Sequence, residues 1–441
     1  MDIECLKERI QNSGVVGAGG AGFPTYAKLD QRVNTIILNC AECEPLLRLH
    51  RQLLEKHSEE IVKTLHKIGE VLGASEMIIG IKEDYTKTIE ALETCMDNYP
   101  GVRLGLLEEV YPAGDEVVLI YEVTGKIVNP GGLPIDIGVA VFNVETIYNV
   151  YRALEEGVGV HDKLISVVGE VEHPVTVRVP VGTTIDEVVS MAGKITTKDY
   201  VYFLGGPMMG SIGTGNTPVT KTTNAVLVLP RDHYIIQMKN SESSIDLKRA
   251  AASCCQCTMC TDLCPRKLLG HPVEPALFMR AATCKDIQEP GIFLDTSFCC
   301  SCGLCELYSC FQGLSPRTLM TEYKQGLKKA GIPIPKDIVP KPVGPEREYR
   351  KVPIKRLISR LGLAQYDKEA PLDDQLRNVK RVKLMLSQHI GAPAVSIVAK
   401  GDEVKMGQTI AEAGKGLSVP IHASITGKIL EVTEKYVIIE R

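Results

Sequence analysis

Two stretches organise this chain: Cys254-Cys255-Gln256-Cys257-Thr258-Met259-Cys260-Thr261-Asp262-Leu263-Cys264-Pro265 and Cys299-Cys300-Ser301-Cys302-Gly303-Leu304-Cys305-Glu306-Leu307-Tyr308-Ser309-Cys310. Together they hold ten of the fifteen cysteines, spaced C-x2-C-x2-C-x3-C-P in the first and C-x2-C-x2-C-x4-C in the second. Three thiolates at such gaps wrap a tight loop around one face of an iron-sulfur cube, and the fourth arrives from elsewhere. The pattern predicts two 4Fe-4S clusters.

The spacing also bears on which cysteine completes which cluster. In two-cluster ferredoxins the fourth cysteine of each run crosses to the other cluster. This resemblance implies one cluster held by Cys254, Cys257, Cys260 and Cys310, and another held by Cys264, Cys299, Cys302 and Cys305. Cys255 and Cys300 could each replace a neighbour, but that choice shortens the first gap to one residue. Phe311 stands where such runs usually have proline, which shapes the turn and does not bind iron.

Structural zinc and disulfides are the alternatives for these cysteines. Zinc usually takes two separated pairs of ligands around a knuckle, whereas these runs are evenly spaced triplets. We recognise no signal peptide, and clustered thiols in a long cytosolic sequence indicate metal binding more often than disulfides. Iron-sulfur clusters remain the preferred interpretation.

Composition limits the classes of function. A chain of 441 residues is expected to form roughly three units at about 150 residues per domain. The formal net charge is -4, and no basic stretch with interleaved aromatic residues suggests nucleic acid. The longest apolar runs, such as 225–230 and 35–38, are far shorter than the ~20 residues of a membrane span. We therefore expect a soluble, cytoplasmic protein without membrane insertion.

A glycine-rich loop lies near the start of the chain, in Gly14-Val15-Val16-Gly17-Ala18-Gly19-Gly20-Ala21-Gly22-Phe23-Pro24. Its bare backbone amides could approach a phosphate closely. Glycine-rich turns without any ligand are also common, so the loop alone leaves both interpretations open. The preceding helix, 1–12, is expected to pack on its own domain, with a targeting peptide as the alternative.

Strands and helices alternate after this loop. Strands are predicted at 33–38, 77–81, 102–107 and 139–144, and helices at 46–72, 84–99, 117–123 and 146–155. This order predicts a doubly wound α/β domain with a mostly parallel sheet, in which ligands lie at the carboxyl ends of the strands. Polar segments at 39–45, 111–116 and 143–146 fall at those ends. Their acidic groups suit hydroxyls and ring nitrogens, which indicates a nucleotide.

The glycine-rich loop and these three polar segments together resemble the flavin-binding loops of the FMN-bearing, NADH-oxidising subunit of complex I, and more closely those of RnfC and PduS. The shared patterns are G-x-G-G-A-G-F-P-T with a downstream lysine, N-x-x-E-x-E-P, Y-x-x-G-D-E and N-V-E-T. Asp115 stands where complex I has a glutamate. The resemblance implies FMN contacts from Gly17, Gly19, Gly20, Gly22, Lys28, Asn39, Glu42, Glu44, Tyr111, Gly114, Glu116, Asn143 and Thr146. His50, His57 and His66 are expected to be solvated, and no catalytic side chain is assigned.

Later segments resemble further modules of the same families. The strand-strand-helix order after residue 163, with a capping box from Thr184 to Glu187, resembles an SLBB β-grasp domain. The glycine-rich turn at 205–210 either closes over the flavin or packs its two methionines. Residues 332–347 are rich in proline and lysine, which is typical of a semi-rigid linker. The end of the chain resembles a lipoyl/biotinyl-type barrel, but Lys415 lacks the usual neighbours of a lipoylated lysine.

Module order separates the relatives, because RnfC carries the barrel half before the flavin domain and PduS carries it at the end, as here. The chain is identified as a member of the PduS-type cobalamin reductases within the RnfC and complex I superfamily. This implies a multidomain α/β protein with a Rossmann-like FMN domain (1–160), an SLBB domain (161–235), a helical two-cluster ferredoxin-like domain (245–330), a linker (331–380) and the barrel (381–441).

The resemblance also implies a function. NADH would reduce FMN, two 4Fe-4S clusters would carry single electrons, and cobalamin would be the acceptor. The partners would be an adenosyltransferase and microcompartment shell proteins, within a bacterial microcompartment. The alternative is an RnfC-like relay subunit of a larger membrane or bifurcating complex.

Overall fold

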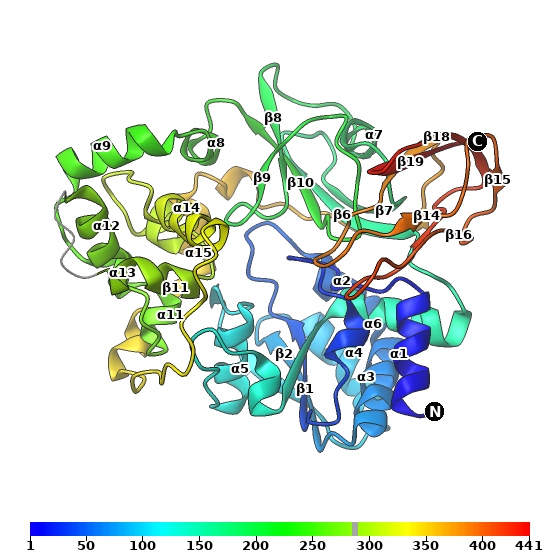
Figure 1. The fold of residues 1–441 in the computed structure, drawn as a ribbon, viewed down its shortest axis with the longest axis horizontal. Coiled ribbons are helices and arrows are strands. Elements are labelled where there is room, and N and C mark those ends of the chain that lie inside the picture. Colours follow the sequence, from blue (N-terminus) through cyan, green and yellow to red (C-terminus); the bar gives the residue numbers. More distant parts are fainter. Residues whose placement is uncertain (285–289) are drawn as a thin grey trace.

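The computed structural model describes residues 1–284 and 290–441. In Figure 1 an N-terminal α/β domain lies at the bottom, a second sheet at the top and a group of short helices on the left. The N-terminal domain is built on a parallel sheet of order β3-β2-β1-β5. Its strands are β1 (Thr35–Cys40), β2 (Glu76–Lys82), β3 (Val102–Leu107) and β5 (Val139–Asn143). The side chains of β1, β2 and β5 are mostly buried, which requires that helices cover both faces of the sheet.

Helices cover both faces, which confirms the doubly wound α/β prediction. One face packs against α1 (Ile3–Asn12), α2 (Leu49–Lys56), α3 (Ser58–Leu72), α4 (Thr86–Met96) and α6 (Val144–Tyr151). The other face packs against α5 (Glu116–Thr124). The single helix expected over 46–72 is two helices, which meet at His57. Helix α3 ends at Gly73, whose left-handed conformation (φ 71°) suits glycine.

The second domain is a six-stranded sheet of order β12-β7-β6-β10-β8-β9. It consists of β6 (Asp162–Gly169), β7 (Val175–Pro180), β8 (Tyr200–Leu204), β9 (Ser211–Gly213), β10 (Ala225–Pro230) and β12 (Leu372–Leu376). Helix α7 (Ile185–Ser190) packs its apolar side against this sheet. The amide of Glu187 donates to the Thr184 hydroxyl, as the capping signal predicts.

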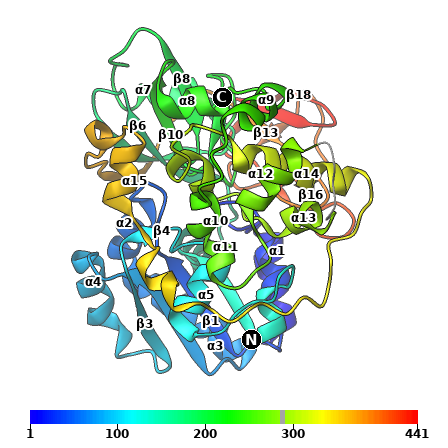
Figure 2. The same ribbon diagram turned by 90° about the vertical axis from the view of Figure 1, so that its left-hand side faces the viewer.

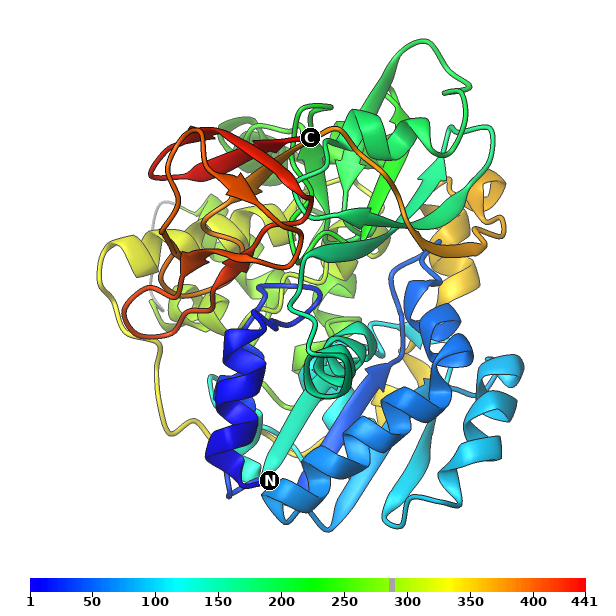
Figure 3. The same cartoon turned by 90° about the vertical axis from the view of Figure 1, so that its right-hand side faces the viewer.

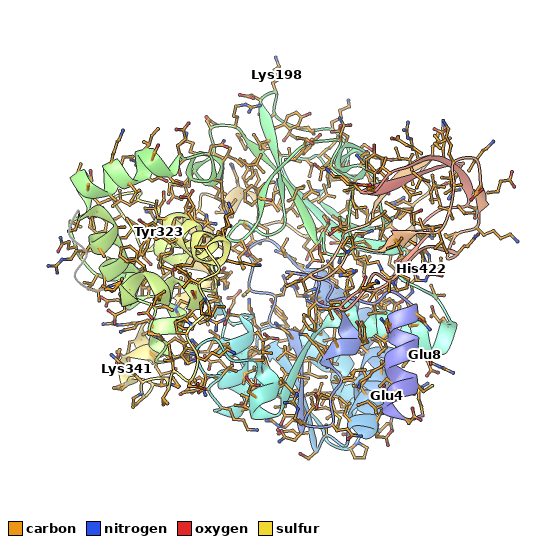
Figure 4. All side chains as sticks on the ribbon, viewed as in Figure 1. Glu4, Glu8, Lys198, Tyr323, Lys341 and His422 are labelled. Atoms are coloured by element: carbon orange, nitrogen blue, oxygen red, sulfur yellow. The ribbon has the colours of Figure 1, made fainter. Side chains whose placement is uncertain are left out.

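Short helices carry the two cysteine runs, and Figure 2 shows this module in front of the N-terminal domain. They are α9 (Ser243–Ser253), α10 (Met259–Asp262), α11 (Pro265–Leu268), α12 (Pro275–Thr283), α13 (Gly291–Leu294) and α14 (Pro316–Lys329). Phe278, Phe293 and Tyr323 pack against one another in its core, and Tyr323 is labelled in Figure 4.

The segment expected as a linker, 331–380, does more than connect domains. Strand β11 (Val352–Pro353) pairs with β4 (Val110–Tyr111) of the N-terminal domain, and β12 pairs with β7. Helix α15 (Ile354–Arg360) buries Leu357 in a core that also contains Tyr111, Phe203 and Leu307. One hydrophobic core therefore joins the N-terminal domain, the second domain and the cysteine module.

The C-terminal barrel has two small sheets. One has the order β13-β19-β18-β15, from β13 (Arg381–Met385), β15 (Glu403–Val404), β18 (Gly427–Val432) and β19 (Tyr436–Glu440). The other has the order β14-β16-β17, from β14 (Val395–Ser396), β16 (Thr409–Glu412) and β17 (Ile421–His422). The barrel sits over α1 and the glycine loop (Figure 3), and the Ile390 amide donates to the Ala21 carbonyl oxygen at 2.9 Å. No helix within the described residues is long and apolar enough to cross a membrane.

Candidate flavin and iron-sulfur sites

A cavity of about 460 Å³ opens at the carboxyl ends of β1 and β5. All thirteen residues expected to contact FMN line it. Such a volume is of the size that one drug-sized ligand fills. The sequence motifs therefore lie together in space, although they come from four separated loops.

The glycine loop forms one wall of the cavity. The Gly17 amide donates to the Phe23 carbonyl oxygen at 2.9 Å, and the Ala18 amide donates to the Thr146 hydroxyl at 3.0 Å. Gly20 has a left-handed conformation (φ 61°), and a Cβ added there would meet nothing within 4 Å. The amides of Gly17 and Ala18 are thus already engaged, and the open backbone at Gly20 is the part of the loop that a phosphate could approach closely.

Three buried polar atoms along the cavity have no hydrogen-bond partner among the described residues. They are Thr25 Oγ1, His50 Nε2 and Asn224 Oδ1. Buried polar atoms normally have partners, so these three fit a cavity that receives a polar ligand. His50 was expected to be solvated, and this expectation is wrong because burial lowers its pKa and its ring faces the cavity.

Two carboxylates that were expected to contact FMN accept hydrogen bonds from backbone amides. Glu42 accepts from the His50 amide at 2.8 Å, at the start of α2. Glu44 accepts from the amides of Met208 (2.9 Å) and Met209 (3.1 Å), and its depth in the molecule raises its pKa to about 7. The turn at 205–210 therefore packs Met208, which is buried, and also brings Met209 to the cavity.

Polar side chains hold the remaining loops in place. Lys28 Nζ donates to the Val141 carbonyl oxygen at 2.8 Å and lies 3.5 Å from Glu116. Asn39 donates to the Gly114 carbonyl oxygen at 2.9 Å, and the Asn143 side chain caps α6. These loops are therefore fixed before any ligand enters.

The cysteines of the two runs line two small pockets, and the spare Cys255 and Cys300 line one pocket each as well. Cys254, Cys257, Cys260 and Cys310 line one small pocket and are called the outer group. Cys264, Cys299, Cys302 and Cys305 line another and are called the inner group. Among the described residues, no three histidine, cysteine or carboxylate side chains gather as a single metal ion would need. A four-iron cube is larger than one ion, and its ligands stand further apart.

The third flavin loop touches the cysteine module directly. The Tyr111 hydroxyl donates to the Cys302 carbonyl oxygen at 2.6 Å, and Arg266 pairs with Asp115 at 2.8 Å. Cys300 and Cys302 line the flavin cavity and the inner-group pocket alike. The inner group and the cavity thus share a wall.

Comparison with known proteins agrees with this arrangement. The chain matches family models for the Nuo51 FMN-binding domain (residues 10–152), the SLBB domain (164–211), a 4Fe-4S dicluster domain (253–315) and the RnfC barrel sandwich hybrid domain (365–440). It is 40% identical over 445 residues to cobalamin reductase PduS of Citrobacter freundii, covering 100% of this chain and 97% of that protein. The chain belongs to the PduS cobalamin reductase family.

Other relatives cover less of the chain or are more distant. PduS of Salmonella typhimurium is 40% identical over 438 residues, covering 99% of this chain and 96% of that protein. A component of the ion-translocating oxidoreductase complex from Edwardsiella ictaluri is 33% identical over 270 residues, or 60% of this chain and 32% of that protein. An NAD+-reducing NiFe hydrogenase chain shares the fold, with a TM-score of 0.51, 22% identity, and coverage of 77% of this chain and 64% of that chain.

These matches confirm the predicted fold class and cofactors: this PduS-family chain is a flavin and iron-sulfur oxidoreductase with an FMN domain and two 4Fe-4S clusters. Sequence reasoning missed His50 and Asn224 as cavity residues, whereas Met209 belongs to the turn for which closure over the flavin was one of two alternatives. Asn224 precedes β10 in a threonine-rich turn without any motif, so no sequence signal marked it.

Proposed function

We propose that this chain is an NADH-dependent cobalamin reductase. The observation that carries the proposal is the wall that the flavin cavity shares with the inner cysteine group, through Cys300 and Cys302. FMN accepts a hydride from a nicotinamide and releases electrons singly, which is how 4Fe-4S clusters take them. The residues of this wall hold the two redox sites next to each other.

The thirteen cavity residues named from the sequence are proposed to hold FMN. The open backbone at Gly20 suits the phosphate, and Lys28 adds a positive charge to the same cavity. The orphan atoms of Thr25, His50 and Asn224 supply further polar contacts. The outer and inner cysteine groups are proposed to hold one cluster each, with Cys255 and Cys300 as bystanders.

Cobalamin is the proposed acceptor because two relatives that match over nearly the full length are cobalamin reductases by name. One NADH would reduce two molecules of cob(II)alamin to cob(I)alamin and release NAD+ and a proton. We further propose that the product passes to an adenosyltransferase, inside a microcompartment whose shell proteins are neighbours.

Anaerobic reconstitution with iron, sulfide and FMN tests the proposal. We expect NADH to bleach the flavin and to convert cob(II)alamin to cob(I)alamin at a stoichiometry of one to two. The control is protein that carries flavin without clusters. It should oxidise NADH when a dye takes electrons directly from the flavin, but it should leave cobalamin unreduced. Full NADH oxidation without cobalamin reduction, alone and with the adenosyltransferase, would remove cobalamin as acceptor.

The 33% identity to a component of an ion-translocating oxidoreductase complex supports a second candidate, an electron-relay subunit of a larger complex. Stable co-purification of the tagged chain with integral membrane proteins from its own cells would favour this candidate over the reductase.

A further inference from the structure

The pocket of the inner group contains buried positive charge. Apart from its cysteines, the charged side chains that line it in the described part of the chain are Arg266 and Arg317, each with 14% of its side chain exposed. No charged side chain among the described residues lines the outer pocket. Arg249 and Arg360 lie near the outer group, but both are exposed and donate to backbone carbonyl oxygens. Solvent and salt screen exposed charges more than buried ones, so the electrostatic surroundings of the two groups differ.

Each of the two buried arginines is paired with a carboxylate that does not line the pocket. Arg266 pairs with Asp115 of the third flavin loop at 2.8 Å, and Arg317 pairs with Glu306 at 2.6 Å. Glu306 is fully buried and also accepts from the Thr318 amide at 2.8 Å. The guanidinium groups line the pocket and their carboxylates do not, so the pocket presents the positive end of each pair.

Both arginines also have an unused hydrogen-bond donor. The Nε–H of each is buried and has no acceptor among the described residues. Of the other described arginines only Arg178 and Arg377 share this feature, and both lie by the second sheet. Buried polar groups normally have partners, and a charged donor without one is costly. The sulfur atoms of an iron-sulfur cluster accept such hydrogen bonds, so two unused donors in one small pocket fit a cluster held there.

We infer that Arg266 and Arg317 donate hydrogen bonds to sulfur atoms of the inner cluster and thereby raise its reduction potential. The inference rests on the proposed placement of one cluster in each cysteine group, and it needs neither NADH nor cobalamin. Reduction adds one negative charge to a cluster whose ligands Cys264, Cys302 and Cys305 are buried, exposing 9%, 8% and 8% of their surface. Burial opposes that charge, whereas hydrogen bonds from charged donors stabilise it. The two arginines therefore offset the cost of reducing a cluster at this depth.

The two arginines are held by different parts of the molecule. Asp115 lines the flavin cavity and caps α5, so the position of Arg266 depends on the third flavin loop. Glu306 lies in the second cysteine run, so Arg317 is held within the cysteine module itself. The two pairs therefore offer independent tests of the same inference.

Unmodified holoprotein that contains ¹⁵N-labelled arginine gives the first test. It is reduced anaerobically with dithionite and mediators at poised potentials, so that one cluster at a time is paramagnetic, and is studied by pulsed EPR. We expect weak ¹⁵N coupling on one of the two cluster signals, because a hydrogen bond to sulfur brings the arginine nitrogen close to the unpaired electron. Cys257→Ala, which removes an outer ligand, should keep this coupling. Arginine coupling on neither signal, or coupling that is lost together with the outer cluster, overturns the inference.

Neutral double variants give the second test, because they remove each arginine without leaving its carboxylate buried and unpaired. They are Arg317→Gln with Glu306→Gln, and Arg266→Gln with Asp115→Asn, in which asparagine can still cap α5. Each keeps the net charge of the protein. In a redox titration followed by EPR, we expect each to make reduction of the inner cluster roughly tenfold less favourable, a shift of about 59 mV to lower potential. The potential of the outer cluster should not change, and an inner potential that is unchanged in both double variants overturns the inference.

Arg280→Gln is the matched control, because it removes an arginine from an exposed position of α12 in the same module. It should leave both potentials unchanged, and a shift as large as that of the double variants would overturn the inference. If the double variants do not fold, the labelling result on the unmodified protein decides. Failure of the proposed function looks different, because dithionite supplies the electrons and both clusters would still titrate. A reconstituted protein without any iron-sulfur signal would overturn the cluster placement and this inference together.

Discussion

Glu44 accepts a 2.9 Å hydrogen bond from the backbone amide of Met208, which joins the second flavin loop to the glycine-rich turn of the second domain. The Met209 amide donates to the same carboxylate at 3.1 Å. Burial raises the pKa of Glu44 from 4.5 to about 7, against the lowering effect of these two amides. The contact that closes this side of the cavity is therefore sensitive to pH.

Glu44→Gln should flatten the dependence of stability on pH between about 4.5 and 7. The folded state keeps a proton on Glu44 in this range, whereas the unfolded state releases it, so stability falls as pH rises. The slope from this group is at most about 1.4 kcal/mol per pH unit. Denaturant unfolding of the holoprotein at several pH values measures it. Glu8→Gln, at an exposed residue of α1, should keep the slope of the unmodified protein; a slope that persists in Glu44→Gln would contradict the assignment.

Gly20 and Gly22 offer a matched pair within the glycine loop. Both have left-handed backbones, but a Cβ on Gly22 would meet Thr222 at 2.7 Å and His389 at 3.3 Å, whereas one on Gly20 would meet nothing. Gly20→Ala should cost only ~1 kcal/mol of stability while it fills cavity space and releases FMN. Gly22→Ala should be clearly less stable because it also pushes on the second domain and the barrel.

Flavin content after gel filtration and the midpoint of thermal unfolding separate these effects. Full flavin retention in Gly20→Ala would show that the phosphate lies elsewhere.

Lys163 and Glu145 form an ion pair beneath the fourth flavin loop, and both side chains are almost completely buried. Glu145→Gln should destabilise the protein by about 3–5 kcal/mol, since it leaves a buried ammonium without its partner. The double change Glu145→Gln with Lys163→Met should recover most of this loss. Chemical unfolding of all three variants checks the prediction, and a double variant that is no better than the single one would argue against the pair as the cause.

The local motifs account for what the sequence could predict. Glycine patterns, the N-x-x-E-x-E-P segment and the cysteine gaps are each continuous in the chain, so short stretches were enough to name residues that line the cavity and the two cysteine pockets. The contacts that these segments make with one another could not be predicted from such stretches. Nothing near Glu44 indicates that its partners are amides of another domain, because a backbone amide leaves no sequence signal.

The segment 331–380 is a second case in which a contact between distant parts of the chain left no local signal in the sequence. The proline and lysine content of 332–347 predicted a linker, and the predicted linker was taken as far as residue 380. Val352 within it nevertheless pairs with Tyr111, which lies far away along the chain. A two-residue strand has no periodicity to recognise. A usable signal did exist in Ile354, Leu357, Ile358 and Leu361, whose spacing is that of one helical face and which all lie in the shared core.

Lys221 links three parts of the molecule, because its buried ammonium group donates to the carbonyl oxygens of Gly14 (2.7 Å) and Pro420 (3.1 Å). Gly14 begins the glycine loop, and Pro420 belongs to the barrel. Burial lowers the pKa of Lys221 from 10.5 to about 7, and a neutral amine still has a hydrogen for each carbonyl. His422, which lies beside Gly14 at the same junction (Figure 4), has a pKa lowered to about 3 and stays neutral.

Lys221 changes the stability of the fold with pH in the opposite direction to Glu44. Between pH 7 and 10.5 the unfolded chain holds a proton that the folded protein has released, so this group makes stability rise with pH, by at most about 1.4 kcal/mol per unit. Lys221→Met should remove that rise and also loosen the barrel from the glycine loop, seen as faster hydrogen exchange at the Ile390 amide. Lys428→Met, at an exposed barrel residue, should change neither quantity. Because the barrel carries no group of its own in the flavin cavity among the described residues, a loss of FMN from Lys221→Met alone would mean that the barrel acts by holding the glycine loop in shape.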